Sequence, residues 1–448
     1  MSNQKIQLKK SQKTYSQYVS SGVEWIGDVP KGWGVKRLKY LTNINKNTLG
    51  ENTMPDYFLK YLDISNVNKG VVNNPVEMIF DDAPSRARRI VKNDDVVLGT
   101  VRTYLQSVAH FENPDKNLIV STGFAVLSSL KEIDSKFLYY QLLSDDFTHR
   151  LVAHSTGVSY PAITPKDLSD LEIFYPSKPE QQKIASYLDK KIGNIEKIVA
   201  KKKEQVGLLK EKRASVISRA VTRGLNPSVE LIDPPSVASA KGGSGVEWIG
   251  KVPKGWEVKK IKEITKIQIG WTPSTAVSEY FEGKNLWATI ADMDRKVIID
   301  TKNKISDKAI EYTQIKKVKK GSLLYSFKLS VGKVAFAGQD MYTNEAIVAF
   351  EPSKKINVRF LYYPFATYLI NNANDNIYGA KLLNQGLIKN SYIALPPTEE
   401  QQKIADYLDE QNKKIDTLIQ KIEQSIQLLQ EYKTSLISSV VRGRVKIK

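Results

Sequence analysis

Apolar residues recur at steps of three and four between residues 397 and 448, and this spacing predicts a long helix. The series forms a heptad seam, which is typical of a helix that packs along a partner of similar length. Thr398-x-x-Gln401 fits a capping box at its start, and Arg442-Gly443 fits a helix end. The predicted seam residues are Ile404, Leu408, Ile415, Leu418, Ile422, Ile426, Leu429, Leu436 and Val440.

The same pattern occurs once earlier in the chain. Ser177-x-x-Glu180 fits a capping-box start, and Arg223-Gly224 marks the expected end. Lys202 stands where the later helix has Ile422, so the two seams differ at this position. The earlier seam is formed by Ile184, Leu188, Ile195, Ile198, Val206, Leu209, Val216 and Ala220.

The regions before these two helices carry a different pattern, with short β-rich segments, glycines and some helix. Residues 96–111 and 322–337 are predicted as strands around turns, and residues 136–152 and 359–373 as helices. A polar loop that contains glycine follows each predicted helix, at 154–163 and 376–386. The mixture predicts an α+β fold class.

Matching sequence motifs show that the chain contains two copies of one unit. GVEWIG and VPKGW occur at 22–33 and again at 245–256. KFLYY at 136–140 matches RFLYY at 359–363, and EQQKIASYLD at 180–189 matches EQQKIADYLD at 400–409. A period this long indicates a duplicated domain, because solenoid repeats are shorter. Trp25, Trp33, Trp248 and Trp256 recur with these words and are expected to be core residues.

The repeat divides the chain into six expected segments. Each copy has a globular domain followed by a long helical region, and a Pro/Gly/Ser-rich linker joins the copies. The segments are a basic N-terminal arm (1–20), globular domain 1 (21–176), helical region 1 (177–225), the linker (226–244), globular domain 2 (245–396) and helical region 2 (397–448).

The amino-acid composition narrows the possible classes of function. The 448-residue chain carries 67 Lys and Arg against 48 Asp and Glu, and this excess of +19 favours nucleic acid as a partner. The chain has no cysteine, which excludes a thiolate metal site. It has only three histidines, which argues against a His-rich metal site. Apolar runs are too short to cross a bilayer, and no apolar segment follows the basic N-terminus. We therefore expect a cytoplasmic protein that contacts no membrane.

Three short motifs resemble catalytic sites but are better explained as local structure. Gly245-x-x-x-x-Gly250-Lys251 lacks the Ser or Thr that a P-loop needs next. The run 233–236 reads DPPS rather than DPPY, so it lacks the aromatic that would stack on a flipped base. Asp134-x-Lys136 resembles a nuclease metal centre, but Asn357-x-Arg359 replaces it in the second copy. We therefore expect no catalytic residue, no bound cofactor and no metal site in this chain.

Polar and basic residues in the variable loops are the candidate DNA contacts. Arginine and lysine suit guanine and phosphate, whereas asparagine and glutamine suit adenine. In the first copy the candidates are Arg86, Arg88, Arg89, Arg102, Tyr104, Gln106, Ser155, Thr156, Ser159 and Tyr160. In the second copy they are Lys328, Ser330, Lys333, Asn374, Asn376, Tyr378, Lys381 and Asn384. Arg86, Arg88 and Arg89 are expected to form one cluster for phosphates.

The ordered words GVEWIG, FLYY and EQQKIA, each present twice, resemble the specificity (S) subunits of Type I restriction–modification systems, the HsdS family. The resemblance covers nearly the whole chain apart from the first twenty residues and the linker. It implies two target recognition domains, here 21–176 and 245–396, each followed by one of two long conserved helices. It also implies that these helices pair as an antiparallel coiled coil.

The resemblance further implies a function without chemistry in this chain. Each target recognition domain reads one half of a bipartite, asymmetric site in double-stranded DNA. Two HsdM modification subunits bind the S subunit and use S-adenosylmethionine to methylate adenine. HsdR motor-nuclease subunits use ATP and Mg²⁺ to cleave DNA.

Two other classes of function remain as alternatives from the residues alone. The chain could be a DNA-binding protein with its own weak methylase or nuclease activity, which an intact cofactor motif would support. It could instead be a coiled-coil scaffold that does not read DNA, and salt-sensitive DNA binding distinguishes this class from a DNA reader.

Overall fold

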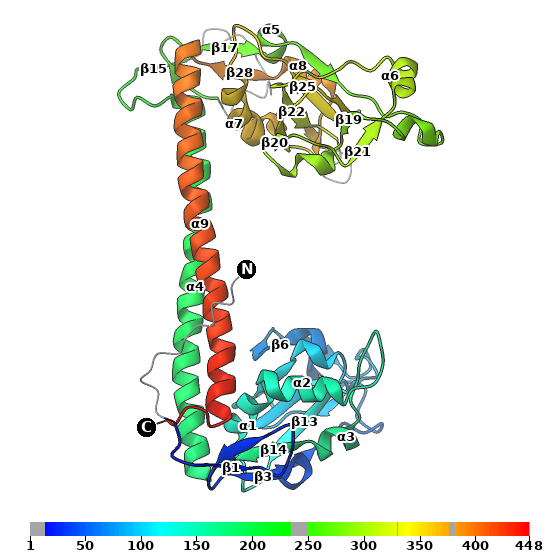
Figure 1. The fold of residues 1–448 in the computed structure, drawn as a ribbon, viewed down its shortest axis with the longest axis vertical. Coiled ribbons are helices and arrows are strands. Elements are labelled where there is room, and N and C mark those ends of the chain that lie inside the picture. Colours follow the sequence, from blue (N-terminus) through cyan, green and yellow to red (C-terminus); the bar gives the residue numbers. More distant parts are fainter. Residues whose placement is uncertain (1–13, 234–248, 329, 376–380, 448) are drawn as a thin grey trace. The chain divides into compact units, whose positions relative to one another are not determined.

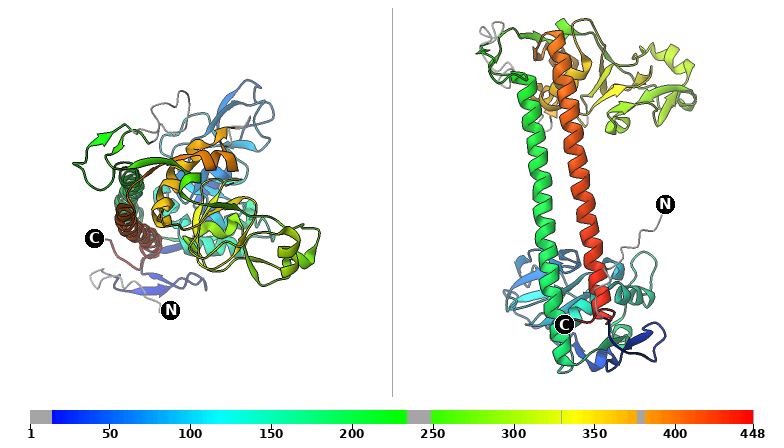
Figure 2. Two further views of the ribbon diagram at one scale, coloured as in Figure 1. Left: turned by 90° about the horizontal axis from the view of Figure 1, so that it is seen from above. Right: turned by 60° about the vertical axis from the view of Figure 1, so that its left-hand side comes forward.

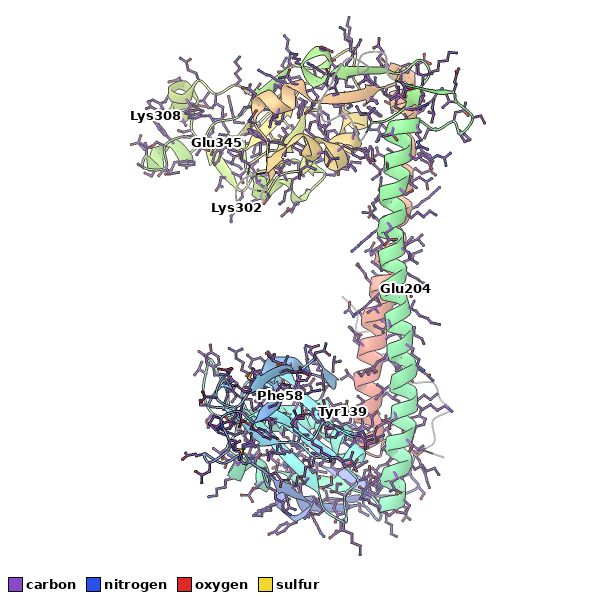
Figure 3. All side chains as sticks on the ribbon, turned by 180° about the vertical axis from the view of Figure 1, so that it is seen from behind. Phe58, Tyr139, Glu204, Lys302, Lys308 and Glu345 are labelled. Carbon is purple, nitrogen blue, oxygen red and sulfur yellow. The ribbon has the colours of Figure 1, made fainter. Side chains whose placement is uncertain are left out.

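The computed structural model describes residues 14–233, 249–328, 330–375 and 381–447. Its contacts divide the chain into two compact units. The first is formed by Met1–Lys203 with Glu423–Lys448, and the second by Glu204–Ile422. The boundaries fall inside two long helices, and Figure 3 labels Glu204 at the first of them. Each unit therefore holds one globular domain and part of each long helix (Figure 1).

The globular domain of the first unit contains two four-stranded sheets. The strand order β11-β10-β13-β4 is antiparallel throughout, and in the order β8-β5-β12-β9 the strands β5 and β12 run parallel. The first sheet comprises β4 (Thr42–Ile44), β10 (Asp95–Gly99), β11 (Val108–His110) and β13 (Phe124–Ser129). The second comprises β5 (Phe58–Leu62), β8 (Val76–Ile79), β9 (Ala87–Ile90) and β12 (Leu118–Ser121), and a hairpin of β6 (Val67–Asn68) and β7 (Val71–Val72) follows β5.

The globular domain of the second unit repeats most of this topology, with β20 added to the edge of its first sheet and no counterpart of β9 among the described strands of its second. Its sheets have the orders β18-β25-β22-β23-β20 and β21-β19-β24, and β19 runs parallel to β24 as β5 does to β12. The first sheet comprises β18 (Ile267–Ile269), β20 (Val297–Ile298), β22 (Leu323–Ser326), β23 (Val334–Ala337) and β25 (Ile347–Phe350). The second comprises β19 (Asn285–Ala288), β21 (Asn303–Ile305) and β24 (Tyr342–Thr343). The duplication expected from the repeated words is thus a duplication of fold.

An antiparallel strand pair joins the first and last parts of each domain. Strand β3 (Gly34–Arg37) pairs with β14 (Glu172–Tyr175), and β17 (Glu257–Lys260) pairs with β28 (Tyr392–Leu395). Because the second strand of each pair leads directly into a long helix, the pairing fixes the domain to the start of that helix.

The linker supplies the second copy with a strand that the N-terminal arm supplies to the first. In β1 (Tyr18–Ser20) and β2 (Asp28–Pro30), Tyr18 lies opposite Pro30. In β15 (Leu231–Ile232) and β16 (Val252–Pro253), Leu231 lies opposite Pro253 in the same register. Part of the arm therefore has a structural counterpart. Residues 1–13 of the arm and 234–244 of the linker lie outside the described residues.

Short helices cover the sheets. Those of the first unit are α1 (Ser135–Leu142), α2 (Asp145–Ala153) and α3 (Pro165–Asp170), and those of the second are α5 (Ile261–Ile264), α6 (Asp307–Thr313), α7 (Val358–Tyr368) and α8 (Gln385–Asn390). Further 3₁₀ turns are η1 (Leu38–Tyr40), η2 (Ile64–Asn66), η4 (Ser278–Phe281), η5 (Ile290–Asp294) and η6 (Leu369–Asn372). Asp134 and Asn357 cap α1 and α7, accepting backbone N–H groups, so the Asp134-x-Lys136 motif has a structural role.

Both predicted long helices are present, as α4 (Lys178–Arg223) and α9 (Thr398–Val441). They lie side by side and run in opposite directions (Figures 1 and 2). In the first unit Glu196 of α4 pairs with Lys433 of α9 at 2.7 Å, and in the second Arg213 pairs with Asp416. The two pairs fit a single antiparallel register. The predicted α+β fold class with an antiparallel helix pair is confirmed.

The predicted seam is wrong at one position in each helix. Ile198 is 45% exposed and Leu418 is 49% exposed, so neither side chain lies between the helices. The half-buried Val199 and Ile419 take these positions. After Ile195 and Ile415, the sequence offers an apolar residue both three and four positions later. The half-buried residue is the one four positions later, because this step keeps the alternation of four and three along the seam.

The predicted capping boxes are also not formed as expected. The Glu180 carboxylate accepts a hydrogen bond from the Tyr15 hydroxyl at 2.6 Å. The Gln401 side chain accepts from the Asn357 backbone N–H at 2.8 Å and donates to the Pro396 carbonyl at 2.8 Å. Glu180 therefore connects the start of α4 to the N-terminal arm, and Gln401 connects the start of α9 to its globular domain.

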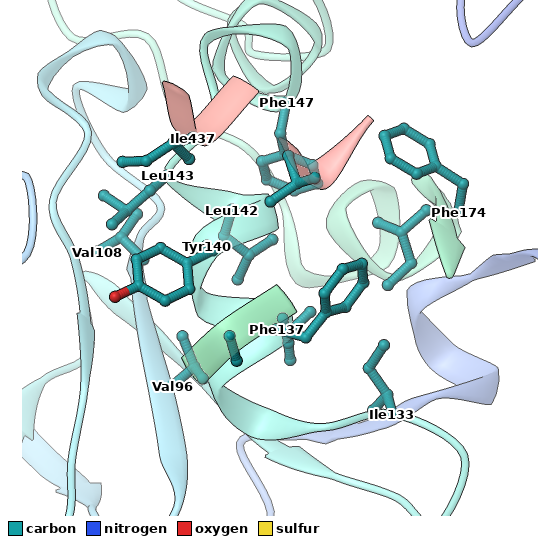
Figure 4. Packing of buried hydrophobic residues seen from close by; sticks show 14 of the residues in the cluster. Val96, Val108, Ile133, Phe137, Tyr140, Leu142, Leu143, Phe147, Phe174 and Ile437 are labelled. Carbon is teal, nitrogen blue, oxygen red and sulfur yellow. The ribbon is translucent and has the colours of Figure 1, made fainter. Parts of the chain in front are cut away.

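The core of the first unit combines the sheet, α1 and both long helices (Figure 4). Phe137, Phe147 and Phe174 are almost fully buried there, together with Ile437 of α9. Trp33 is 8% exposed and its ring stacks on Phe174, with 6.1 Å between centroids. Trp256 of the second unit is 5% exposed, so the expectation of core tryptophans is confirmed for these two.

Trp25 has a different environment, and Trp248 lies outside the described residues. The Arg150 guanidinium lies 3.3 Å from the centroid of the half-buried Trp25 ring, and it donates to the Glu172 carbonyl at 2.8 Å. Burial lowers the pKa of Arg150 to about 9. Arg442, directly after α9, pairs with Asp146 at 2.9 Å and donates to the Ile26 carbonyl at 3.2 Å. The first GVEWIG segment therefore anchors the end of α9 to its domain.

Candidate nucleic-acid interface

The turn between β10 and β11 has an unusual backbone. It contains the 3₁₀ turn η3 (Thr103–Leu105), and the residue on each side of η3 adopts a left-handed conformation. These residues are Arg102, with φ of 52°, and Gln106, with φ of 54°. Side chains other than glycine rarely adopt this conformation, and it persists only where surrounding contacts impose it. The turn is thus a rigid support for the side chains that it carries.

The second candidate loop, 154–163, docks directly on this turn. The Arg102 backbone N–H donates to the Pro161 carbonyl at 2.7 Å, and the Ile163 N–H donates to the Thr100 carbonyl at 2.9 Å. The hydroxyl groups of Thr103 and Ser155 lie 2.9 Å apart. Two loops that are distant in sequence therefore form one surface, called here the two-loop surface (residues 100–107 and 154–163).

The tip of loop 154–163 is closed by its own backbone. Thr156 and Ala162 exchange two backbone hydrogen bonds of 2.9 Å. Gly157 has φ of 104°, and a Cβ there would lie 3.2 Å from the Tyr160 carbonyl oxygen, so the turn needs glycine. The turn leaves Val158, Ser159 and Tyr160 on the outside, and Tyr160 is 61% exposed.

Arg102 and Tyr160 meet across the two-loop surface. The Arg102 guanidinium carbon lies 4.4 Å from the centroid of the Tyr160 ring. This distance places the cation over the ring face, where the ring quadrupole attracts it. Both residues line a cleft of about 610 Å³, together with Asp63, Arg86 and Thr122. The cleft joins polar, basic and aromatic groups on one exposed side of the domain.

Arg86 reaches the same cleft but is already paired. Its Nε donates to the Asp63 carboxylate at 2.9 Å and to the Tyr61 hydroxyl at 3.1 Å. Burial alone would raise the pKa of Asp63, but hydrogen bonds from Tyr61 and from the Ser65 N–H, with the charge of Arg86, lower it. Asp63 is therefore an anion that fixes Arg86 in place.

Arg88 and Arg89 do not join Arg86, so the expected three-arginine cluster is not formed. The Arg88 guanidinium lies 4.6 Å from the Phe80 ring centroid. Arg89 donates to the Thr48 hydroxyl at 3.1 Å, and burial lowers the pKa of Arg89. Arg88 and Arg89 are successive residues of β9 and therefore point to opposite faces of the sheet, whereas Arg86 precedes this strand.

Several other candidates of the first domain have structural partners. The Gln106 amide donates to the Thr148 hydroxyl at 2.8 Å and to Asp145 at 3.3 Å, both on α2. Ser155 donates to the Leu151 carbonyl at 2.6 Å. Tyr104 is 51% exposed, and Ser159 is also exposed. The candidate side chains that remain outward on the two-loop surface are Arg102, Tyr104, Thr156, Ser159 and Tyr160.

The corresponding turn of the second unit lies between β22 and β23 and differs in its side chains. Lys328 and Ser330 are exposed. Lys333 is engaged, because its ammonium group lies 2.5 Å from Asp294 and 3.4 Å from the Ile290 carbonyl. The two copies thus present different residues on the same element of the same scaffold.

The other candidates of the second unit belong to the loop 376–386. Asn374 lies in β26 (Asn374–Asp375) and Lys381 in β27 (Lys381–Leu382), two strands that pair with each other. Asn384 caps α8, and its side chain accepts from the Leu387 N–H at 2.9 Å. Asn376 and Tyr378 lie outside the described residues.

Sequence reasoning missed two residues of interest. Asp63 fixes Arg86, but no motif marks it as different from other exposed acids. Trp271 is 58% exposed, whereas Trp287, whose indole N–H donates to the Trp271 carbonyl at 3.1 Å, is buried. The sequence does not single out Trp271, because neither Trp271 nor the buried Trp287 has a tryptophan counterpart in the first copy.

Two searches of the described residues bear on other classes of site. No group of three or more His, Asp or Glu side chains in this part of the chain could hold a metal ion. No helix among the same residues is both long and apolar enough to cross a membrane.

The fold and its loops define a class of protein with two copies of one recognition scaffold, each carrying different outward side chains. The model of the type I restriction modification DNA specificity domain matches residues 30–207 and again residues 253–428. The chain belongs to this family.

Individual relatives agree with the family. The chain is 33% identical over 186 residues to the type I restriction enzyme MjaIX specificity subunit of Methanocaldococcus jannaschii, which covers 39% of this chain and 43% of that subunit. It is 22% identical over 452 residues to the MjaVIII specificity subunit of the same organism, and this match covers 94% of both chains. It is 25% identical to the Haemophilus influenzae HindI specificity subunit, over 63% of this chain and 71% of that one.

Solved structures share the fold. A chain from a study of complex assembly and conformational transition of the type I R-M system has a TM-score of 0.73 and 22% identity, covering 93% of this chain and 99% of that chain. The HsdS subunit from Thermoanaerobacter tengcongensis has a TM-score of 0.56 and 22% identity, covering 93% and 98%.

Proposed function

We propose that this chain is the DNA specificity subunit of a type I restriction–modification complex. Its target recognition domains, residues 21–176 and 245–396, each read one half of a bipartite, asymmetric DNA site. The helical regions 177–225 and 397–448 carry these domains. The chain itself is non-catalytic, and partner subunits modify and cleave the DNA.

One observation carries the proposal. The order β11-β10-β13-β4 of one domain corresponds to β23-β22-β25-β18 of the other, yet the turn after the second strand of this order carries Arg102 and Tyr104 in one domain and Lys328 and Ser330 in the other. Base edges are read by side chains with matching hydrogen-bond donors and acceptors. Recognition of two different half-sites therefore requires different outward side chains on a common scaffold. The excess positive charge supplies sequence-independent affinity for the DNA backbone.

The partners follow from the family. The proposed complex contains two HsdM modification subunits, which use S-adenosylmethionine to methylate adenine in each recognised site. HsdR motor-nuclease subunits join the complex for cleavage and use ATP and Mg²⁺. The assembly works in the cytoplasm, where chromosomal and invading DNA are both accessible.

Selection from a DNA library tests the proposal. The chain is assembled with its modification subunits, and duplexes that bind are sequenced. We expect two short, different base patterns separated by a constant spacer, together with affinity that falls steeply as salt is raised. Binding without base preference, or no binding beyond that of the modification subunits alone, would contradict it.

A further inference from the structure

We infer that Arg102 reads a guanine in the major groove of the half-site contacted by the first domain. The inference rests on the proposed function and adds to it a specificity-determining residue and the base that this residue recognises. It depends on three properties of the described surface: the orientation of Arg102, its freedom from carboxylate partners, and the chemistry of its neighbours.

The orientation of Arg102 is set before any ligand binds. Its left-handed backbone is held by the Pro161 carbonyl, which accepts from the Arg102 N–H at 2.7 Å, and by the Leu105 N–H, which donates to the Arg102 carbonyl at 2.9 Å. The Tyr160 ring supports the guanidinium from one face at 4.4 Å. A guanidinium held by its face keeps its N–H groups directed outward in one plane. Little side-chain entropy then remains to be lost on binding.

The donors of Arg102 are available, unlike those of its neighbours. Arg86 in the same cleft is paired with Asp63, and the Gln106 amide is used by Thr148 and Asp145. The ion pairs formed among the described residues include Arg86 but not Arg102. Arg102 is therefore the arginine of this cleft whose planar donor pair can be offered to a ligand.

The chemistry favours a base edge over a phosphate. Guanine presents two adjacent acceptors, O6 and N7, in the major groove, and arginine matches them with two parallel N–H groups. Phosphates are contacted equally well by flexible lysines, which do not need a fixed plane. Recognition of a base edge requires that the plane and angle of the guanidinium are fixed. The rigid turn and the Tyr160 ring fix them.

The assembled complex provides the test, with the wild-type recognition pattern first determined by library selection. Each guanine of that pattern is then replaced, one at a time, by 7-deazaguanine, which lacks the N7 acceptor. Binding is measured for the wild type and for Arg102→Ala, which removes all donors of the side chain, because lysine could still donate to guanine. We expect one guanine, in one half-site, where the wild type loses roughly 5-fold or more in affinity and Arg102→Ala loses nothing further.

Two controls separate this role from a structural one. Tyr160→Phe keeps the supporting ring and should retain the preference for guanine. Arg37→Lys changes an exposed arginine of β3 that pairs with Asp170 at 3.4 Å, and it should leave the base pattern unchanged. Melting temperatures of all variants should match that of the wild type, because Arg102 is exposed.

The remaining outcomes decide against the inference. An unchanged guanine preference in Arg102→Ala would overturn it, and so would a loss of affinity in this variant that is equal for all sequences, which indicates a phosphate contact. In both cases the wild-type complex would still select two base patterns, so the proposed function would stand. If the wild-type complex selected no pattern, the proposed function itself would fail.

Discussion

The Tyr140 hydroxyl donates a hydrogen bond to the Asp189 carboxylate at 2.5 Å, and Tyr363 donates to Asp409 at the same distance. Tyr140 and Tyr363 are the last residues of the two FLYY words, and Asp189 and Asp409 end the two EQQKIA words. The repeated motifs therefore contain the donor and the acceptor of a hydrogen bond that fixes each recognition domain to its long helix. Figure 4 shows Tyr140 at the edge of the first core, with its hydroxyl group pointing away from the core.

Removal of this bond should destabilise the first unit. Tyr140→Phe should lower the free energy of unfolding by about 1–2 kcal/mol, because a hydrogen bond to a charged acceptor is lost. Tyr139→Phe is the matched control, since this neighbouring tyrosine (Figure 3) packs against His110 and Tyr140 through its ring. Urea unfolding followed by tryptophan fluorescence measures both, and equal losses in the two variants would count against the assignment.

The second unit should lose stability in acid through Asp409. Burial alone would raise the pKa of Asp409, but hydrogen bonds from Lys296, Tyr363 and Arg359 lower it to about 2. Its pKa in the unfolded chain is about 3.9, so the folded state holds fewer protons between these values. The contribution, about 1–2 kcal/mol after allowance for partial exposure, is complete above pH 4 and disappears as the pH falls toward 2.

Asp409→Asn should remove this pH dependence. The unfolding free energy of the variant should vary less between pH 4 and pH 2 than that of the wild type, measured by urea titration at each pH. Asp406→Asn is the comparison, because Asp406 lies on the same helix and also pairs with Arg359, but its side chain is 56% exposed against 28% for Asp409, so the effect of its lowered pKa should be smaller. A wild-type slope that persists in Asp409→Asn would show that another group is responsible.

The corrected seam makes a second pair of variants informative. Ile415 is 5% exposed and Leu418 is 49% exposed, although both were expected between the helices. Ile415→Ala should cost about 2–3 kcal/mol, whereas Leu418→Ala should cost less than about 0.5 kcal/mol. Thermal unfolding followed by circular dichroism distinguishes them. Similar costs for both would restore the seam with Leu418 inside.

The exposed Trp271 should affect DNA binding more than stability. Trp271→Ala should leave the unfolding free energy within about 1 kcal/mol of the wild type, because most of the side chain is in solvent. Its ring is free to stack on or pack against DNA, so the assembled complex should bind several-fold more weakly. Trp287→Ala, which empties a buried site, should instead cost about 3–5 kcal/mol. DNA affinity unchanged by Trp271→Ala would exclude it from the interface.

The sequence was informative where its signal is periodic or repeated. The heptads predicted α4 and α9, and the paired words predicted two copies of one domain. The error at Ile198 and Leu418 arose because Ile198 precedes Val199 and Leu418 precedes Ile419, so adjacent apolar residues fit the pattern equally well. Only the packing of two helices decides between steps of three and four.

The candidate site was predicted less well, because side-chain direction depends on contacts far along the chain. Loops 100–107 and 154–163 were both chosen, but their docking through Arg102 and Pro161 has no local signal. Gln106 was expected to face DNA, yet its amide bonds to α2. Which residues of a loop turn outward is fixed by such partners, and the composition of the loop does not contain them.

A domain exchange tests the central claim most directly, namely that each recognition domain reads its own half-site. Residues 253–395 are replaced by the corresponding segment of another specificity subunit, and methylated adenines are mapped across the genome of cells that express this chain with its partner subunits. The account predicts that one half of the recognised pattern changes, while the other half and the spacer between them stay as in the wild type. A change in both halves, or a change in the spacing, would contradict it.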